Sequence, residues 1–507
     1  MNGERPASGR VRRTSLGALA LTGASALRLT LQFALLPILA RLIGPAGYGL
    51  VALAMPFILF ANVLADGGMS YALGRRKEVG RELESTVFWL AGGIGAALAL
   101  ICCAAAWPMA AILRQPALPP LIMALSPIML MNGLTAASNG RIIREGRFGT
   151  FAVGDLISTV VSATVAVLAA LRGLGAWSLV AQQLTLWICK LAWVTFAGKA
   201  RIGLAFRPRE AVELLRFGLH TIGATLADFV SRNVDALIVG GVLGTTSLGY
   251  YAMAYQIVRV PDMLISGPLY LYIFTAVSRT AHDAGPRALQ DLAASALRLG
   301  SAALAPLFCG LALTADLAVP LVLGEKWIAA IAPLRWLAGA GFFFCICSIV
   351  ATTLMGLGRT ALQLRLSLTL GATTIVVVAA AARLGLVPVA VALAAGMGGA
   401  CALYVARLAA ALKVGVAALA ASFAPALAGC AAMTAALIGL RTVLAPMNPN
   451  PAAEFALLVA AGAVVYGAVI LAIGRRRLRE DLRAFGRAQS ERPADAASVP
   501  ETLASVA

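Results

Sequence analysis

Residues 214–254 read LLRFGLHTIGATLADFVSRNVDALIVGGVLGTTSLGYYAMA, and this stretch decides the fold. Most of it is apolar enough for a membrane-spanning helix, although Asp228, Arg232 and Asp235 lie in its middle. Spacings of four and three residues place all three side chains on one helical face, with Arg232 between the two carboxylates. Charges at membrane depth cost at least ~2.5–3.5 kcal/mol each, so we expect this face to contact protein or water rather than lipid.

The end of this stretch has a near-copy earlier in the chain. Residues 243–254 (LGTTSLGYYAMA) resemble residues 43–54 (IGPAGYGLVALA), with an offset of 200 (244 − 44). The offset aligns Gly44 with Gly244 and Gly49 with Gly249, and it extends outward to pair Gln32 with Arg232, Asn62 with Asp262 and Gly67 with Gly267. Two copies of a helix–tight turn–helix unit predict a duplicated transporter that has its site between the copies and the glycine turns as hinges.

The composition places the whole chain in a membrane. Of its 507 residues, 60% are hydrophobic and only 12% are charged, which is more apolar surface than a soluble protein can bury. The net charge of +19 does not indicate nucleic-acid binding, because the basic residues cluster in every second loop. The basic N-terminus leads directly into an apolar segment without an evident cleavage site, so we expect an uncleaved first helix.

Apolar windows predict an all-α polytopic membrane protein with about fourteen spans, by the rule of ~20 residues per span. The predicted spans are 16–40, 47–72, 86–107, 118–140, 151–171, 175–197, 217–242, 247–275, 299–323, 328–355, 362–382, 386–409, 416–440 and 453–473. They group into an N-lobe (16–197) and a C-lobe (217–409) joined by a basic linker (198–216). A basic N-terminus (1–15), two extra helices (410–473) and a basic, partly disordered tail (474–507) complete the predicted organisation.

The loops predict the orientation. Clusters such as GRRKEVGRE (74–82), KARIGLAFRPRE (199–210) and IGRRRLREDLRAFGR (473–487) lie on one side of the predicted membrane, and the alternate loops have at most one base each. The basic side is cytoplasmic by the positive-inside rule, so both termini are predicted to be inside. We therefore expect a multi-pass membrane protein.

Ionisable residues inside the spans are the candidate functional residues. Ten of them are selected, namely Arg28, Asp66, Lys190, His220, Asp228, Arg232, Asp235, Arg259, Asp262 and Arg335. If the bases share one cavity, that cavity is electropositive and suits an anionic substrate, since the guanidinium fork fits phosphate oxygens. We therefore assign substrate binding to the five Arg and Lys residues. Ion coupling or charge balance is assigned to Asp228, Asp235, Asp262 and Asp66.

Each candidate also has a structural interpretation. Asp228, Arg232 and Asp235 can form a clamp that neutralises itself, and Arg259 and Asp262 can do the same across Pro261. Pro261 frees a backbone carbonyl and favours a kink or hinge. Lys190 and Arg335 lie near the ends of their spans, so their side chains can extend to the membrane surface. Asp66 precedes a possible helix break at Gly67-Gly68. His220 is expected to be packed and hydrogen-bonded. Arg28 has no acid on its own helix, only Gln32 one turn later, which favours a ligand contact.

Signatures of other chemistry are missing from the sequence. It contains no G-x-x-x-x-G-K-[ST] phosphate loop, no H-E-x-x-H and no G-x-S-x-G. The eight cysteines all lie in apolar segments without metal-binding C-x-x-C spacing, so we expect buried thiols, no metal and no cofactor. We do not expect an enzyme.

Four blocks resemble Wzx-type polysaccharide flippases, in their WzxC-like branch of the polysaccharide synthase and transport family. The blocks are residues 31–73, 233–261, 321–338 and 356–368. This resemblance covers roughly residues 15–440 and implies the fold shared with multidrug antiporters and lipid II flippases: two six-helix lobes and two extra helices. It also implies that Arg28, Arg232 and Arg259 match cavity bases by position. The second span departs from the family pattern, because it has Asp66 and no base.

The resemblance implies a function. The expected substrate is an undecaprenyl-diphosphate-linked oligosaccharide, moved to the outer leaflet by alternating access for exopolysaccharide, capsule or O-antigen synthesis. The expected partners are this lipid-linked glycan, membrane lipid, and a polysaccharide polymerase with its export machinery. A cation-coupled drug or metabolite exporter of the same fold is the leading alternative, and a membrane-embedded glycan polymerase or ligase is a further one.

Overall fold

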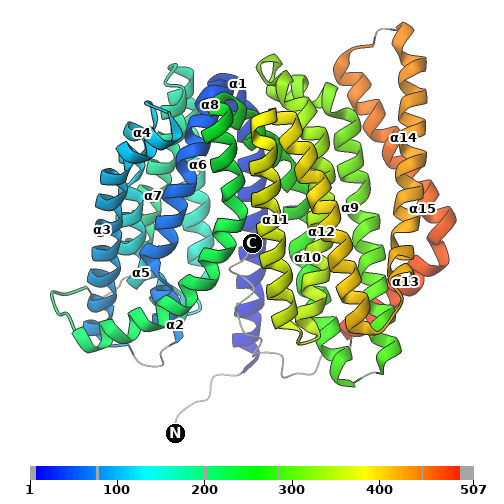
Figure 1. The fold of residues 1–507 in the computed structure, drawn as a ribbon. Coiled ribbons are helices and arrows are strands. Elements are labelled where there is room, and N and C mark those ends of the chain that lie inside the picture. Colours follow the sequence, from blue (N-terminus) through cyan, green and yellow to red (C-terminus); the bar gives the residue numbers. More distant parts are fainter. Residues whose placement is uncertain (1–6, 76–78, 199–201, 284, 448, 491–507) are drawn as a thin grey trace. The chain divides into compact units, whose positions relative to one another are not determined.

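The computed structural model describes the backbone of residues 7–75, 79–198, 202–283, 285–447 and 449–490, and the side chains of most of these residues. Throughout these ranges the chain forms helices and short connections, without a β-strand (Figure 1). Helices satisfy every backbone hydrogen bond within one segment, which is the condition for crossing lipid. The all-α prediction is therefore confirmed.

Two very long helices are each interrupted at a glycine. Helix α1 (Ala7–Asp66) breaks at Gly44, with φ 76° and ψ 173°, and α8 (Pro208–Asp283) breaks at Gly244, with φ 83° and ψ 172°. This region of φ and ψ is open essentially to glycine alone, because a Cβ would clash with the backbone. The two duplicated turns thus share one backbone conformation.

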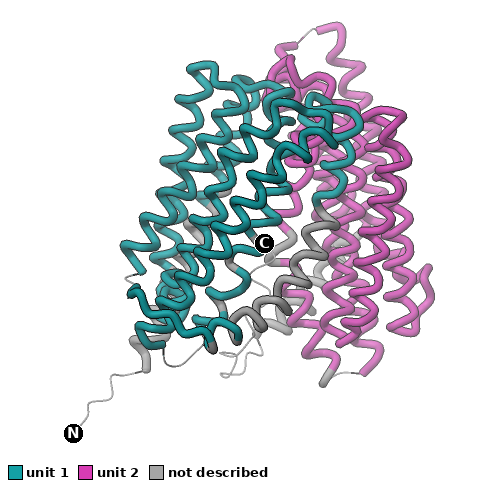
Figure 2. The backbone as a smooth tube through the Cα atoms, turned by 60° about the vertical axis from the view of Figure 1, so that its left-hand side comes forward, with its two compact units in different colours: residues 1–249 teal, residues 250–507 magenta. Residues whose placement is uncertain are grey.

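Residues up to Gly249 form one compact unit (Figure 2, teal). Besides α1 and the first part of α8, it contains α2 (Met69–Arg75), α3 (Arg81–Leu113), α4 (Leu118–Leu125), α5 (Pro127–Arg144), α6 (Phe148–Leu171) and α7 (Ala176–Gly198). Helix α1 packs against α3, α5, α6 and α7, and α6 lies along α7. The predicted break after Asp66 is present, since Gly67 and Gly68 both have positive φ between α1 and α2.

Residues from Tyr250 onward form the second compact unit (Figure 2, magenta). Its helices after α8 are α9 (Pro286–Leu323), α10 (Ile331–Gly356), α11 (Thr360–Ala381), α12 (Leu386–Leu412), α13 (Val416–Ala420), α14 (Ala424–Leu444) and α15 (Pro451–Ser490), with short 3-10 turns η1 (Glu325–Ala330), η2 (Ala382–Leu384), η3 (Ala421–Phe423) and η4 (Ala445–Met447). Helix α10 packs against α9 and α12, and α14 packs against α9 and α15. The units divide within α8, whereas the predicted lobes divide at residues 198–216, and that lobe division stays a prediction.

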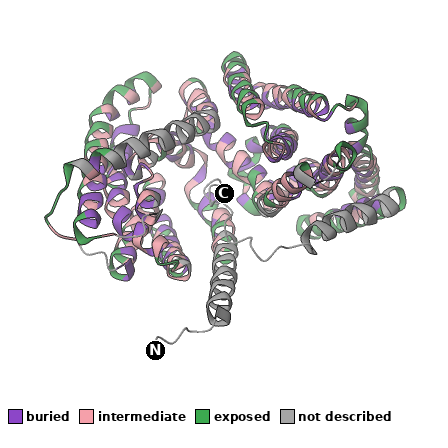
Figure 3. Ribbon diagram, turned by 90° about the horizontal axis from the view of Figure 1, so that it is seen from below, coloured by how far each residue is buried: buried purple, intermediate pink, exposed green. Residues whose placement is uncertain are grey.

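Twelve helical stretches within the described residues are long and apolar enough to cross a membrane. The stretches in α1 and α8 each contain a glycine break. The predicted number of fourteen spans stays a prediction. Large apolar side chains are exposed, for example Ile112 on α3 and Val464 on α15. Figure 3 shows exposed residues on many of the helices. Exposed apolar side chains of this kind fit a lipid surrounding, because lipid tails do not penalise them.

A short loop before α8 is fastened to the start of α3. The backbone N–H of Gly203 donates to Ser85 Oγ at 2.7 Å, and Trp89 Nε1 donates to the Gly203 carbonyl at 2.8 Å. Four residues later the backbone N–H of Arg207 donates to Thr86 Oγ1 at 3.0 Å, and the Arg207 guanidinium pairs with Glu82. The loop is therefore held to the first unit at both of its ends.

Candidate functional site: a cluster of two bases and one carboxylate

Two basic side chains, Arg28 and Lys190, meet at the carboxylate of Asp155, and the three residues come from three helices of the first unit. Arg28 Nη1 on α1 donates to Asp155 Oδ2 on α6 at 2.9 Å, and Lys190 Nζ on α7 donates to Asp155 Oδ1 at 3.3 Å. The side chains are partly exposed, 41% for Arg28 and 22% for Asp155. Each base engages a different carboxylate oxygen, so the cluster has two positive charges and one negative charge.

Helix packing explains why Asp155 reaches both bases. A Cβ on Gly154 would collide with the Trp193 ring, so the glycine lets α6 and α7 lie close together at this level. Trp193 Nε1 donates to the Thr150 carbonyl at 3.0 Å and fixes the relative position of the two helices. Asp155 and Lys190 are thereby held within hydrogen-bonding distance.

Aromatic rings border the cluster on the Lys190 side. The Lys190 Nζ lies 5.6 Å from the centroid of the Phe151 ring and 5.3 Å from that of the Trp187 ring. Phe151 is four residues before Asp155 on α6, and Trp187 is three residues before Lys190 on α7, so each ring shares a helical face with its charged neighbour. Ring faces stabilise an ammonium group, and they also stack on sugar rings.

Arg28 keeps unused hydrogen-bonding capacity. A guanidinium has five N–H donors, and only the bond to Asp155 is formed with the described residues. Its buried Nε has no hydrogen-bond partner among them. Because a buried donor without a partner costs roughly 1–3 kcal/mol, this arrangement favours an additional acceptor at the site.

Asp155 was not among the predicted site residues. Arg28 has no acid on the part of α1 before Gly44, but the fold brings it the Asp155 carboxylate, 127 residues away in the sequence. The only signal in the sequence was an acid near the start of an apolar span, and a single sequence does not tell which base it meets.

The other predicted bases lie elsewhere. Arg335 on α10 belongs to the second unit, where it donates to Asp316 on α9 at 3.2 Å, and Arg441 on α14 binds the same carboxylate at 3.0 Å. Asp316 and Arg441 were likewise not among the predicted site residues. Arg259 is exposed, and the described residues offer it neither an ion pair nor a hydrogen bond.

Among the predicted acids, Asp262 and Asp235 have described side chains. Asp262 accepts hydrogen bonds from Tyr270 Oη at 3.2 Å and Cys345 Sγ at 3.5 Å rather than from Arg259 across Pro261. Asp235 is buried, with 5% of its surface exposed. The side chains of Asp66, His220, Asp228 and Arg232 lie outside the described residues, so the three-residue cluster on α8 stays a prediction.

Comparison with known proteins identifies the family. The family described as polysaccharide biosynthesis proteins matches residues 38–332, which is 295 of 507 residues (332 − 38 + 1). The succinoglycan biosynthesis transport protein ExoT of Rhizobium meliloti is 27% identical over 331 residues, 65% of this chain and 67% of ExoT. The lipopolysaccharide biosynthesis protein WzxC of Escherichia coli is 24% identical over 337 residues, with the same coverage.

Two solved structures share the fold. A lipid II flippase, MurJ, in an inward closed conformation superposes with a TM-score of 0.73 at 14% identity, over 91% of this chain and 100% of MurJ. An inward-facing multidrug resistance transporter of the MATE family superposes with a TM-score of 0.62 at 16% identity, over 76% of this chain and 95% of the transporter. The resemblance to Wzx-type flippases is thus confirmed at the level of family and fold. Since the family match covers more than half of its length, this chain belongs to the polysaccharide biosynthesis protein family of polytopic helical membrane proteins.

Proposed function

We propose that this protein is a flippase for an undecaprenyl-diphosphate-linked oligosaccharide. It moves this substrate from the inner to the outer leaflet of the bacterial cytoplasmic membrane, for exopolysaccharide, capsule or O-antigen synthesis. The family supports the substrate class, since relatives are named for succinoglycan transport and lipopolysaccharide biosynthesis. The fold supports the transport mode, because both structural neighbours are named as a flippase or a transporter.

One observation carries the assignment of the diphosphate site. Arg28 and Lys190 converge on the two oxygens of one carboxylate at 2.9 and 3.3 Å. A phosphate group presents oxygens of the same charge and similar spacing, so Asp155 occupies the place that a substrate phosphate takes. In this proposal Asp155 positions the two bases between transport cycles and gives way when the diphosphate binds.

The aromatic border gives the glycan a place beside the phosphates. Phe151 and Trp187 flank Lys190, and a sugar ring that follows the diphosphate can lie against these faces. The lipid tail would stay in the bilayer, and access would alternate by movement around the Gly44 and Gly244 turns. Arg232 and Arg259 remain proposed cavity bases, and Asp228, Asp235, Asp262 and Asp66 remain proposed coupling or charge-balancing residues.

A cation-coupled exporter of drugs or metabolites is the second candidate. It is favoured by Asp262, which is held by two neutral donors rather than by a base and is therefore able to bind a cation. Such an exporter would carry cationic compounds and would not need the Arg28–Lys190 pair.

Transport by the purified protein separates these candidates. The full chain is reconstituted into vesicles with a fluorescent lipid-linked oligosaccharide, and membrane-impermeant dithionite measures how much label reaches the outer leaflet. Wild type should flip the lipid, and Arg28→Ala and Lys190→Ala should each reduce the rate at least about tenfold, the loss of one charge-assisted contact. Arg172→Ala, an exposed base in a loop of the same unit, is the matched control and should behave as wild type.

Three outcomes would count against the proposal. No flipping by wild type, together with uptake of a cationic dye, would establish the exporter. Lengthening of the oligosaccharide would indicate a polymerase. The assignment of the charge cluster as the diphosphate site would be wrong if the three variants flip the lipid at equal rates, namely Arg28→Ala, Lys190→Ala and Arg172→Ala.

A further inference from the structure

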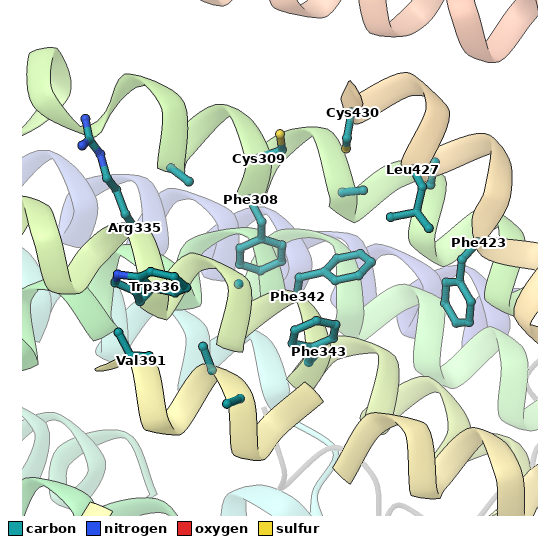
Figure 4. A pocket seen from close by; sticks show the side chains of 16 residues that line it. Phe308, Cys309, Arg335, Trp336, Phe342, Phe343, Val391, Phe423, Leu427 and Cys430 are labelled. Atoms are coloured by element: carbon teal, nitrogen blue, oxygen red, sulfur yellow. The ribbon is translucent and has the colours of Figure 1, made fainter. Parts of the chain in front are cut away.

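The second unit contains an apolar pocket, and its lining includes Arg335, one of the five bases assigned to substrate binding from the sequence. Its volume is about 500 Å³, which is within the usual range of small-molecule sites. Helices α9, α10, α12 and α14 and the turn η3 surround it, and aromatic rings from Phe308, Phe342, Phe343 and Phe423 line it (Figure 4). Phe342 packs edge to face with both Phe308 and Phe343, with ring centroids 6.4 and 5.8 Å apart.

One end of the pocket is charged. Arg335 lines the pocket and also pairs with Asp316, whose carboxylate is shared with Arg441. Two bases on one carboxylate leave an excess of one positive charge. Arg335 is 47% exposed in this cluster, so its guanidinium can meet a further anion. Figure 4 shows Arg335 and Phe423 at opposite ends of the pocket.

The rest of the lining offers a ligand almost no polar groups. Apart from Arg335, the polar side-chain atoms of the lining are the Trp336 N–H and the thiols of Cys309 and Cys430. A sugar or another hydrophilic molecule would lose its hydrogen bonds to water there without replacement. The pocket therefore suits an apolar chain attached to a negatively charged group.

The pocket also has the length and the opening that a lipid chain needs. Phe423, at one end of the pocket, directly precedes α14, and Arg335, at the other end, shares the Asp316 carboxylate with Arg441 of α14. Arg441 lies 17 residues after the start of α14 (441 − 424), so the two ends are separated by about 26 Å along this helix at 1.5 Å per residue. Leu427 on α14 and Trp336 on α10 line the pocket and are also 61% and 49% exposed, so the pocket opens to the surface of the unit. The opening has apolar side chains at its edge, so it is accessible to an apolar chain from outside the unit.

We propose that this pocket binds one phospholipid with an anionic headgroup, with an acyl chain among the phenylalanines and the phosphate at Arg335. By the predicted orientation, the headgroup lies in the outer leaflet. The lipid is a resident of the protein rather than its cargo, so the inference does not rest on the proposed flippase function.

Binding of defined lipids to the delipidated full chain in detergent tests the proposal, with adducts measured by native mass spectrometry. The probes are phosphatidylglycerol and phosphatidylcholine with identical chains. Wild type should retain one phosphatidylglycerol at about tenfold higher affinity than phosphatidylcholine, because both lipids offer a phosphate but the quaternary ammonium of phosphatidylcholine is repelled by the excess positive charge at Arg335. Arg335→Gln should bind both lipids equally.

A glycine in the lining allows the pocket to be filled without a clash. A Cβ on Gly339 meets no atom within 4 Å, so Gly339→Leu places its side chain in the pocket. Gly399 on α12 is equally open but does not line the pocket, and Gly399→Leu is the matched control. Gly339→Leu should weaken phosphatidylglycerol binding at least about tenfold, and Gly399→Leu should bind as wild type does.

The proposal is overturned if Gly339→Leu keeps the lipid, or if wild type binds the two phospholipids equally. Undecaprenyl phosphate serves as a competitor. If it displaces phosphatidylglycerol at tenfold lower concentration, the pocket belongs to the carrier lipid and the phospholipid assignment is wrong. None of these readouts involves transport, so they are independent of the flippase test.

Discussion

Gly49 and Gly249 face each other across the two duplicated turns, and a Cβ on Gly49 would lie 2.6 Å from the backbone nitrogen of Gly249. The same Cβ would collide with the Thr245 carbonyl, and a Cβ on Gly249 would collide with the Pro45 carbonyl. The contact is thus reciprocal between equivalent positions. The backbones of α1 and α8 touch here, which only glycine permits.

The first prediction follows from this crossing. Gly49→Ala and Gly249→Ala should each destabilise the protein by roughly 1–3 kcal/mol, because the neighbouring atoms are backbone and cannot rotate away. The measurement is the monodisperse fraction after detergent extraction, together with the unfolding temperature. Gly399→Ala, where a Cβ meets no atom within 4 Å, is the control. Wild-type behaviour of both turn variants would disprove the tight crossing.

The second prediction concerns Arg28 in cells. Arg28→Ala should abolish glycan export, since a charge-assisted contact of roughly 1.5–3 kcal/mol is lost, and membrane abundance should stay near normal. Arg28→Lys should restore part of the export, because the charge remains but the fork is lost. Export and abundance are measured together in a strain that lacks its native flippase. Normal export by Arg28→Ala at normal abundance would exclude Arg28 from the substrate site.

The third prediction separates positioning from binding at Asp155. Asp155→Asn raises the charge of the cluster from one to two positive, and we expect lower abundance because the bases lose their shared counter-ion. Adding Lys190→Gln returns the charge to one, so the double variant should regain abundance. It should not regain export if Lys190 binds substrate. Recovery of both abundance and export would make Lys190 a purely structural base.

The fourth prediction is a pH dependence outside the membrane spans. Burial alone would raise the pKa of Glu145, but hydrogen bonds from Arg141 and Arg147 outweigh it and lower the pKa below its ordinary value of 4.5. A lowered pKa stabilises the fold above pH 4.5, and this contribution is lost as the pH falls through the folded-state pKa. Glu145→Gln should therefore lower the free energy of unfolding by roughly 0.2–1 kcal/mol at pH 7. At a pH below the folded-state pKa of Glu145, the substitution should leave the free energy of unfolding unchanged. Thermal unfolding at both pH values measures it, and a pH-independent difference would contradict the ion pairs.

The fifth prediction concerns orientation. Leu204, 91% exposed before α8, and Met447, 72% exposed after α14, lie at loops that the basic-residue pattern places on opposite sides. In a background without native cysteines, Leu204→Cys should resist a membrane-impermeant maleimide in intact cells, and Met447→Cys should react. Permeabilised cells provide the control, in which both should react. Labelling of both positions in intact cells would refute the predicted topology.

The sequence predicted the helices well because their signals are local. Apolar runs, the glycine turns at residues 44 and 244, and the break after Asp66 are each visible within a few residues of chain. The charge clusters were not predictable in the same way. Asp155 and Arg28 are 127 residues apart, and the bond between Asp316 and Arg441 spans 125 residues. Such contacts depend on which helices pack together, and one sequence does not state that.

The attachment of the loop before α8 to the start of α3 has a consequence for which positions tolerate mutation. Its attachments use the backbone N–H and carbonyl of Gly203 and the backbone N–H and guanidinium of Arg207, so the side chains of residues 204–206 take no part in them. Leu204 and Phe206 are both exposed. Substitutions at residues 204–206 therefore preserve these attachments, and we expect the sequence of this segment to vary among related proteins. Changes at Ser85 or Thr86 have no such freedom, because those hydroxyls are the anchors.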